Sequence, residues 1–285
     1  MDLKGHTAVV TGGGRGLGRA FAQALGARGA KVVVIARSEH ELDETVASIG
    51  SRARAFAANV TDAESVGEVF RKIGAVDVLV NNAGVLGPIG PFAETDFDDW
   101  WRTIDVNVRG SMLCMHAVLP GMIERHGGRI INIVTSAFSP AYLSAYLTSK
   151  TALIRATECI AAETKPHRVS IFSAGPGTVA TAMTNRSLHS PEGQKWIPWF
   201  RQTFDQGLTL PPERPAAMIA ALASGKYDAL SGLYVTPFDD LDALVANRDR
   251  VEQERLHTLQ IRPLKASEVS AALTAIRDQA CRART

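Results

Sequence analysis

The chain has 285 residues, of which 46% are hydrophobic and 21% are charged, so it holds enough apolar material for one large α/β domain or two small ones. Its formal net charge of +2 is too small to indicate a nucleic acid or a membrane surface as a partner. The apolar runs are far shorter than a membrane span, and a strand-like run begins too early to leave room for a signal peptide. Three widely spaced cysteines, Cys114, Cys159 and Cys281, indicate reduced thiols. We therefore expect a soluble cytoplasmic protein without a metal site.

A glycine-rich turn lies between the first predicted strand, 6–11, and the first predicted helix, 19–28. With the threonine before it, the spacing is Thr-Gly-x-x-x-Gly-x-Gly. Such a turn lets backbone N–H groups approach a pyrophosphate at the N-terminus of a helix. The turn therefore predicts a dinucleotide site. The candidate residues in this turn are Gly12, Arg15, Gly16, Leu17 and Gly18.

The end of the second predicted strand, 31–36, indicates which dinucleotide binds. Domains that select NAD carry an Asp or Glu there, which bonds the ribose 2′-hydroxyl, whereas this chain has Ala36 followed by Arg37 and Ser38. An arginine can bond a 2′-phosphate through two N–H groups, and Arg15 in the glycine turn could add a second charge. This pattern predicts NADP(H) rather than NAD(H). The alternative is that both arginines are solvated surface residues.

Small and amide residues follow the fourth predicted strand, 76–80, in the order Asn-Asn-Ala-Gly over 81–84. Amides and a glycine that allows close backbone approach suit a loop that faces a cofactor. Further on, a long helix is predicted from about 95 to 125, with a kink or break at Pro120. Asn107 lies in its middle, and because asparagine is a mediocre helix former, it is either exposed or present for a reason.

Tyr146 and Lys150 lie four residues apart, which places them one above the other on the same face of a helix that follows a fifth strand, 129–134. An ammonium held close to a phenol favours the phenolate and lowers the pKa of the tyrosine. The pair is therefore a candidate general acid/base. Further strands are predicted at 168–173 and 233–235. The regular alternation of strands and helices predicts an α/β fold, a Rossmann-type doubly wound parallel sheet of about seven strands flanked by helices, with a C-terminal helical extension.

Together these motifs resemble the short-chain dehydrogenase/reductase superfamily over about residues 3–235. The resemblance rests on five motifs in order. They are Thr11-Gly12-x-x-x-Gly16-x-Gly18, Asn81-Asn82-Ala83-Gly84, Asn107, Ser136 ahead of Tyr146-x-x-x-Lys150, and Pro176-Gly177 with Thr181.

The resemblance implies a catalytic tetrad of Asn107, Ser136, Tyr146 and Lys150. In such enzymes the tyrosine exchanges a proton with the substrate oxygen, and the lysine lowers its pKa and bonds the nicotinamide ribose. The serine orients the carbonyl, and the asparagine helps to hold a water that leads to the lysine. Hydride chemistry belongs to the cofactor, so the protein must supply orientation and a proton donor.

The resemblance also implies three further cofactor contacts. They are the loop at 81–84 near the adenosine, the loop after the sixth strand, which closes over the nicotinamide, and the end of the third strand near the adenine, where an asparagine replaces the frequent aspartate. The residues carried over in this way are Asn59, Val60, Asn82, Ala83, Gly84, Pro176, Gly177, Val179 and Thr181. In a departure from the family pattern, Ser136 lies only ten residues before Tyr146. Thr135, Ser139 and Ser144 therefore compete with Ser136 as the hydroxyl that orients the substrate.

The interval 182–212 lacks clear periodicity and corresponds in the superfamily to a mobile lid over the substrate. We expect substrate contacts from Met183, Trp196 and Trp199 in the lid, and from Phe138 and Tyr142 ahead of the candidate tyrosine. Alternatively, the tryptophans anchor the lid. An aromatic wall predicts a small-molecule substrate that is bulky and partly hydrophobic.

The chain continues for fifty residues beyond the last predicted strand. We therefore divide it into a catalytic domain, 1–238, and a C-terminal helical extension, 239–285. Leu241, Leu244 and Val245 recur at helical spacing, which predicts that the extension is folded up to about residue 261 and packs on the body, near the lid or across a subunit interface. A second helix is predicted after Ser267.

The sequence thus predicts an NADP(H)-dependent oxidoreductase that interconverts a secondary alcohol and a ketone. Alternatives are a reductase of an imine or enone at the same site and a non-catalytic NADP-binding sensor or scaffold. The family resemblance, and the apolar residues spread around the helices near 103–119 and 151–162, predict a homo-oligomer, a tetramer or a dimer.

Overall fold

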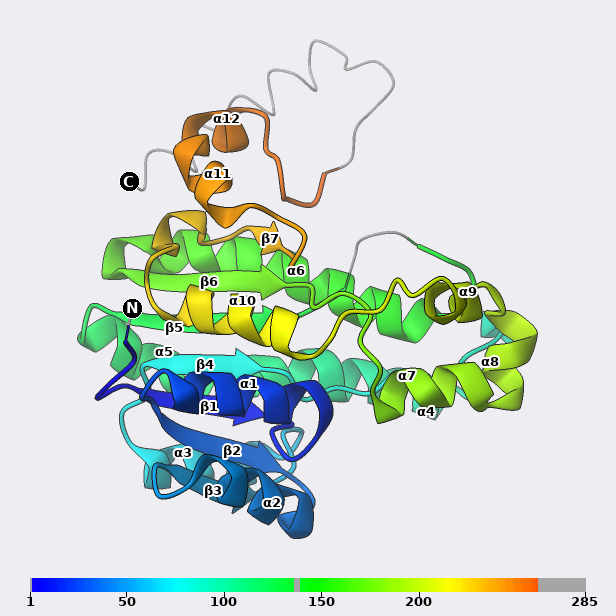
Figure 1. Ribbon diagram of the computed structural model, residues 1–285, viewed down its shortest axis with the longest axis horizontal. Helices are drawn as coiled ribbons and strands as arrows, with labels where there is room; N and C mark the ends of the chain where they lie inside the picture. The colour runs from blue at the N-terminus through cyan, green and yellow to red at the C-terminus, as the bar shows by residue number, and fades with distance from the viewer. Residues whose placement is uncertain (1, 136–138, 261–285) are drawn as a thin grey trace.

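A computed structural model describes residues 2–135 and 139–260 as a parallel sheet covered by helices on both faces (Figure 1). The predicted second helix of the extension and the candidate residues Ser136 and Phe138 lie outside these described residues. None of the described helices is both long enough and apolar enough to cross a membrane.

The sheet has the order β3-β2-β1-β4-β5-β6-β7, and every pair of neighbouring strands is parallel. This order confirms the predicted doubly wound fold, because the chain moves outward from β1 in one direction and then crosses to β4 to move in the other. The strands are β1 (Thr7–Thr11), β2 (Lys31–Ala36), β3 (Ala53–Ala57), β4 (Val78–Asn81), β5 (Gly128–Ile133), β6 (Val169–Ala174) and β7 (Tyr234–Val235).

Helices connect the strands and build the lid and the extension. The α-helices are α1 (Gly16–Ala27), α2 (Glu39–Ile49), α3 (Ala63–Ile73), α4 (Phe97–Ile104), α5 (Gly110–Glu124), α6 (Ser144–Thr164), α7 (Ala182–His189), α8 (Pro191–Trp196), α9 (Trp199–Asp205), α10 (Glu213–Ala223), α11 (Leu241–Ala246) and α12 (Arg248–Gln253). A π-helical turn, η2 (Asp105–Arg109), joins α4 to α5, and short 3₁₀ turns lie at η1 (Phe92–Glu94), η3 (Lys165–His167) and η4 (Asp228–Leu230). The predicted break at Pro120 is wrong, since α5 continues through this residue to Glu124.

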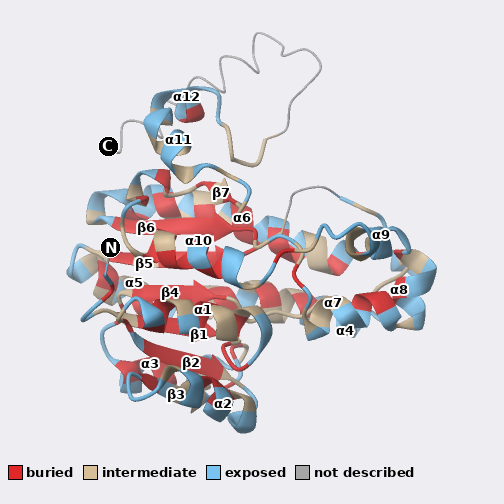
Figure 2. Cartoon of the chain, in the orientation of Figure 1, coloured by how far each residue is buried: buried red, intermediate tan, exposed pale blue. Residues whose placement is uncertain are grey.

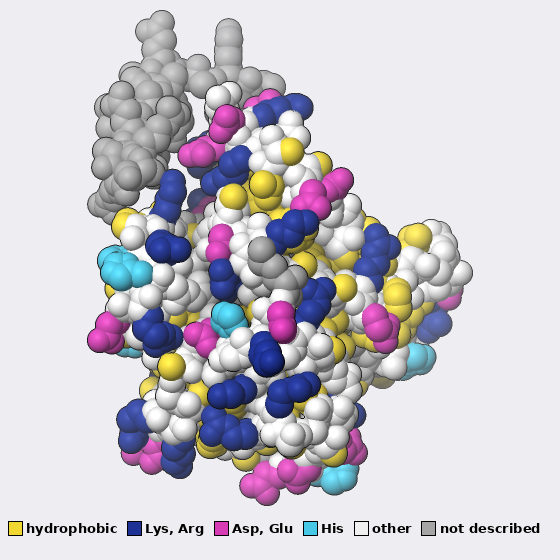
Figure 3. Space-filling view, turned by 60° about the vertical axis from the view of Figure 1, so that its left-hand side comes forward, with side chains coloured by type: hydrophobic (Ala, Val, Ile, Leu, Met, Phe, Trp, Pro, Cys, Tyr) yellow, Lys and Arg dark blue, Asp and Glu magenta, His cyan; other side chains and the backbone are white. Residues whose placement is uncertain are grey.

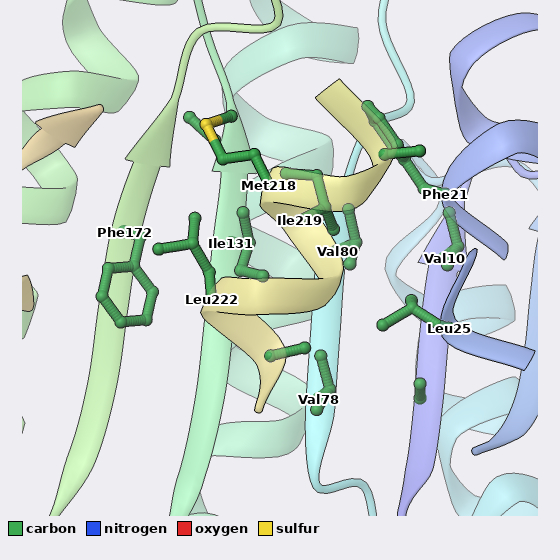
Figure 4. Packing of buried hydrophobic residues seen from close by; sticks show 14 of the residues in the cluster. Val10, Phe21, Leu25, Val78, Val80, Ile131, Phe172, Met218, Ile219 and Leu222 are labelled. Carbon is green, nitrogen blue, oxygen red and sulfur yellow. The ribbon is translucent and has the colours of Figure 1, made fainter. Parts of the chain in front are cut away.

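The central strands are buried on both faces, which explains why they are apolar almost throughout rather than alternating (Figure 2). On one face, α1 and α10 pack against the sheet, with Phe21, Leu25, Ile219 and Leu222 lying over the middle strands (Figure 4). On the other face, the apolar side chains of α3 and α5 form a second core with β1, β4 and β5. On the face shown in Figure 3, both basic and acidic side chains lie at the surface.

A buried chain of polar side chains fixes α5 and α6 to the sheet. The Nδ2 atom of Asn81 donates to Asn132 Oδ1 at 2.9 Å and to the carbonyl of Ser111 in α5 at 3.2 Å. The Nδ2 atom of Asn132 in turn donates to Thr157 Oγ1 in α6 at 2.9 Å. Because buried hydrogen bonds of this kind are costly to leave unmade, they set the position of α6, which carries the candidate tyrosine and lysine.

The described part of the extension is folded and wraps around the β7 edge of the sheet. Leu241, Leu244 and the buried Val251 pack on the core under α1 and α10, whereas Leu259 packs on the opposite face, against α6. Between them the chain runs beside β7, where Tyr234 N donates to the carbonyl of His257 at 2.9 Å and the His257 ring bonds the Tyr234 carbonyl at 2.8 Å. The extension therefore covers an edge strand that would otherwise present unpaired backbone groups.

Truncation after Val235 should lower the melting temperature, because it removes Val251 from the core and exposes the β7 edge. A loss of several kcal/mol in the free energy of unfolding is expected from the apolar surface uncovered. Calorimetry of the full chain and the truncated chain measures the loss, with light scattering to follow association through the bared edge. A truncation after Gln260 is the matched control, and equal melting temperatures for the full chain and the Val235 truncation would contradict the role of the extension.

Candidate active site

The glycine turn leads directly into α1, and the N-terminus of this helix has no side-chain cap. Arg15 occupies the capping position without making a capping bond, and the first turn of the helix contains no acid, whereas Ser38 and Asp62 cap α2 and α3. A β-carbon added at Gly18 would lie 2.1 Å from the carbonyl of Gly12, so only glycine fits there. The free N–H groups and the close backbone approach suit a phosphate group.

Thr11, which the sequence analysis used only as a motif residue, holds the β1 and β4 ends together. Its Oγ1 accepts from the backbone N–H groups of Asn82 and Ala83, both at 3.0 Å. Asn82 Nδ2 donates two hydrogen bonds, to the carbonyl of Thr11 at 3.0 Å and to that of Gly12 at 3.2 Å. The predicted cofactor loop from Asn82 to Gly84 is thereby fixed beside the glycine turn.

The two arginines predicted to select NADP(H) differ in their surroundings. Arg37 is exposed at the end of β2, and none of the ion pairs among the described residues involves it. Arg15 pairs with Glu41 of α2 at 3.1 Å, an exposed pair that contributes little to stability and can exchange partners.

Two other predicted cofactor residues, at the ends of β2 and β3, lie at the surface. Ser38 accepts from Glu41 N as the cap of α2, and Asn59 is exposed at the end of β3 beside the buried Val60.

Tyr146 and Lys150 lie in α6, as predicted, with the lysine nitrogen 5.8 Å from the centre of the tyrosine ring. The lysine is 4% exposed, and its Nζ donates to the carbonyl of Ile133 at the end of β5 at 2.8 Å. A β-carbon added at Gly84 would lie 3.5 Å from Nζ, so the cofactor loop reaches the lysine. The structure thus brings the Tyr-x-x-x-Lys pair and the Asn-Ala-Gly loop together.

The pKa of Tyr146 does not follow the sequence-based expectation. Burial raises the pKa of Tyr146 to about 12, and burial lowers the pKa of Lys150 to about 8. The reason is that the lysine ammonium faces the carbonyl of Ile133 and forms no hydrogen bond with the phenol, so desolvation decides both shifts. At neutral pH the phenol is therefore protonated and the lysine charged.

Asn107 is fully buried in the π-helical turn, so it is not the exposed helix residue that the sequence left as one alternative. Its Oδ1 accepts from Val85 N at 2.8 Å, and its Nδ2 donates to the Val85 carbonyl and to Ser149 Oγ, both at 2.9 Å. Ser149 in turn donates to the Tyr146 carbonyl at 2.6 Å. Sequence analysis missed Ser149, although its position three residues after the tyrosine puts it on the same side of the helix.

Three of the hydroxyls predicted to compete for orienting the substrate, those of Thr135, Ser136 and Ser139, belong to a loop that is only partly described. Ser136 and Phe138 lie outside the described residues, while Thr135 is half-buried and Ser139 is exposed. Ser144 accepts from Trp100 Nε1 at 3.0 Å.

The predicted loop after β6 lies against the glycine turn. Gly177, which follows Pro176, has a left-handed φ of 73°, and Val179 forms a bridge with Leu210 at the end of the lid. Thr181 caps α7 through a capping box with Thr184. A β-carbon added at Gly16 would lie 3.7 Å from the Thr181 methyl group, so the α7 N-terminus stands opposite the α1 N-terminus.

The lid interval contains α7, α8 and α9 and contacts two loops around the tyrosine. The Trp196 ring lies 4.8 Å from that of Tyr142, and the Tyr142 carbonyl accepts from Gly90 N at 3.0 Å. Met183 is half-buried in α7. Trp199 contacts Phe200 within α9, with ring centres 5.8 Å apart. The structure therefore joins Tyr142 and Trp196.

Comparisons with known proteins agree with this geometry. The family model described as short chain dehydrogenase matches residues 6–192. A short chain dehydrogenase of Pseudocercospora fijiensis is 32% identical over 283 residues, which covers 91% of this chain and 90% of the relative. An NAD⁺-bound xylitol dehydrogenase superposes with a TM-score of 0.75 at 25% identity, covering 83% of this chain and 98% of that one. An actinorhodin polyketide ketoreductase variant with NADPH superposes with a TM-score of 0.74 at 27% identity, covering 81% of this chain and 95% of that one.

Replacement of Asn107 by alanine should destabilise the protein, because it removes the hydrogen-bond partner of the partly buried N–H and carbonyl groups of Val85 and of the buried Ser149 hydroxyl. A loss of about 1–3 kcal/mol is expected, against less than about 1 kcal/mol for Asn59→Ala at an exposed position. Urea unfolding of the two variants and the wild type measures the difference. Equal losses for Asn107→Ala and Asn59→Ala would show that the amide does not hold the loop.

Proposed function

The chain belongs to the short chain dehydrogenase family, and on that premise we propose that it is an NADP(H)-dependent oxidoreductase that interconverts a secondary alcohol and a ketone. The observation that carries the proposal is the pairing of Tyr146 with a buried, charged Lys150 beside the Asn82–Gly84 loop. A protein that only binds a dinucleotide has no need to bury a lysine charge next to a tyrosine.

The residues at the carboxyl ends of the strands fit a dinucleotide. The uncapped N-terminus of α1 and the glycines beside it would hold the pyrophosphate. Thr181, which lies opposite Gly16, would lie on the other side of the pyrophosphate. The loop from Pro176 to Val179 would lie against the nicotinamide. When bound, the cofactor supplies or accepts the hydride.

The side chains of the chain itself supply the proton and the orientation. In reduction, the protonated Tyr146 donates its phenolic proton to the carbonyl oxygen as that oxygen gains negative charge, and in oxidation the proton returns to the phenolate. With a pKa of about 12, the Tyr146 phenol is protonated before the transfer. The nearby Lys150 charge stabilises the phenolate that is left after the transfer. Asn107 holds the helix in place through Ser149 and the Tyr146 carbonyl.

The choice of NADP(H) rests on the end of β2. The named structural neighbours include one with NAD⁺ and one with NADPH, so family membership does not decide the cofactor. Ala36 offers no carboxylate to repel a 2′-phosphate, and the exposed Arg37 is in position to pair with it. Arg15 can join by leaving Glu41.

The substrate is proposed to be bulky and partly hydrophobic. Tyr142 and Trp196 form an aromatic contact between the lid and the loop that leads to Tyr146, and Met183 is half-buried in the first lid helix. Apolar and aromatic lining of this kind favours a large organic ketone over a small polar one.

Tyr146→Phe should lower turnover about 10²–10⁴-fold with cofactor affinity nearly unchanged, because it removes only the proton donor. NADPH oxidation, followed by absorbance against panels of ketones, imines and enones, measures the effect and also separates ketone reduction from the alternative reactions. Binding of NADPH is measured in parallel by titration. Near wild-type turnover in Tyr146→Phe would mean that another group is the acid.

NADPH should bind more tightly than NADH, and Arg37→Ala should remove most of the difference, at a cost of about 1.5–3 kcal/mol for the lost charge-assisted bond. The dissociation constants of both cofactors for wild type and variant give the comparison. Arg102→Ala, which removes an exposed arginine on α4, is the matched control. Equal affinities of the wild type for NADPH and NADH would refute NADP selection.

A further inference from the structure

A large aromatic side chain stands exposed beside the loop that the proposed function assigns to the nicotinamide. Phe238 follows β7 and is 63% exposed. Its Cε2 atom lies 3.4 Å from the position that a β-carbon on Gly177 would take, and Leu210 Cδ1 lies 2.9 Å from the same position. Because β6 and β7 are parallel neighbours, the residues that follow them emerge at the same end of the sheet.

The turn from Thr236 to Asp239 holds the ring in this exposed position. Asp239 Oδ2 accepts from Thr236 N at 2.6 Å and from Thr236 Oγ1 at 2.8 Å, and Asp239 N donates to the Thr236 carbonyl at 3.1 Å. Phe238 N donates to Thr236 Oγ1 at 3.3 Å. An apolar ring fixed in this way toward solvent keeps its apolar surface available to a ligand instead of burying it in the core.

An arginine lies against this ring and has no acidic partner among the described residues. The guanidinium carbon of Arg214 is 5.2 Å from the ring centre, and its Nη2 donates to the Pro237 carbonyl at 3.1 Å. A guanidinium has five N–H donors, so this one bond leaves donors for an anion.

The acids that follow Phe238 are held elsewhere. Asp239 accepts from Thr236, Asp240 caps α11 by accepting from Ala243 N, and Asp242 pairs with Lys226 at 2.7 Å. Among the described residues, no ion pair joins Arg214 to these carboxylates or to the neighbouring Glu213. The guanidinium thus lies over the Phe238 ring, and the exposed remainder of the ring is apolar.

We propose that Phe238 and Arg214 form a substrate subsite, which holds the end of the substrate farthest from the reacting carbon and takes a flat apolar group that carries a carboxylate. The ring stacks on the apolar body, and the guanidinium bonds the carboxylate in the two-pronged geometry that arginine offers. This inference rests on the proposed function for the location of the reacting carbon. It narrows the substrate class from bulky ketones to bulky organic acids with a keto or hydroxyl group.

The test compares 6-acetyl-2-naphthoate with its methyl ester, which lacks the charge and adds one methyl group, in NADPH-driven reduction. The wild type should prefer the acid in kcat/KM by about 10-fold or more, as expected for a charge-assisted contact. Arg214→Gln should bring the ratio close to one by raising KM for the acid, whereas KM for the uncharged ester should change far less. Arg214→Lys should keep part of the preference, and Phe238→Leu should raise KM for both probes.

Arg102→Gln is the matched control, since it removes an equal charge from the exposed surface of α4. The proposal is overturned if the wild type uses acid and ester equally, if Arg214→Gln keeps the preference, or if Arg102→Gln loses as much of it as Arg214→Gln. The proposed function still stands in each of these cases, because the ketone is reduced.

If neither probe is reduced, the subsite is judged by equilibrium binding alone. Calorimetric titration of the full chain with 2-naphthoate and with 2-naphthamide should show tighter binding of the acid to the wild type, and equal binding of the two to Arg214→Gln. Equal binding of acid and amide to the wild type would overturn the subsite.

Discussion

The candidate active site depends on one buried amide. Asn107 bonds both backbone groups of Val85 and the hydroxyl of Ser149, so a single side chain connects the loop after β4 to the helix that carries Tyr146 and Lys150. The π-helical turn places this side chain, because the extra residue rotates Asn107 inward without ending the helix. The relative position of the loop after β4 and the helix that carries Tyr146 is thus held by hydrogen bonds through one buried side chain.

The same arrangement keeps a charge in an unfavourable place. Lys150 is almost completely buried, and the lowering of its pKa to about 8 corresponds to about 3 kcal/mol against the charged form. The hydrogen bond from Lys150 to the carbonyl of Ile133 offsets part of this cost. The bond from Asn132 to Thr157 helps to hold α6, which carries the lysine, in position. No acid of the described residues pairs with Lys150, so its charge can interact with a phenolate or with a ligand hydroxyl, which a lysine in an ion pair would not do.

Local patterns in the sequence were sufficient for the strands, the glycine turn and the Tyr146–Lys150 helix, because apolar runs and glycine spacing report on nearby residues only. They also placed the helical residues Leu241, Leu244 and Val245 of the extension. They did not predict the raised pKa of Tyr146, which depends on the lysine facing Ile133, nor the bonds made by Thr11 and Ser149, which join elements about seventy and forty residues apart. Nor could they show that Phe238 returns to Gly177, because neither residue lies in a periodic segment. Each feature that the sequence did not predict depends on a contact between residues that are far apart along the chain.

The wrapping of the extension around β7 has a consequence for how the chain is made. During synthesis the sheet can assemble strand by strand, yet its last edge stays open until His257 and Leu259 have left the ribosome and reached Tyr234 and α6. An open strand edge is where a nascent chain pairs with the wrong neighbour. Docking of the segment near His257 and Leu259, and not completion of the sheet, is therefore the step after which this edge is protected from other copies of the chain.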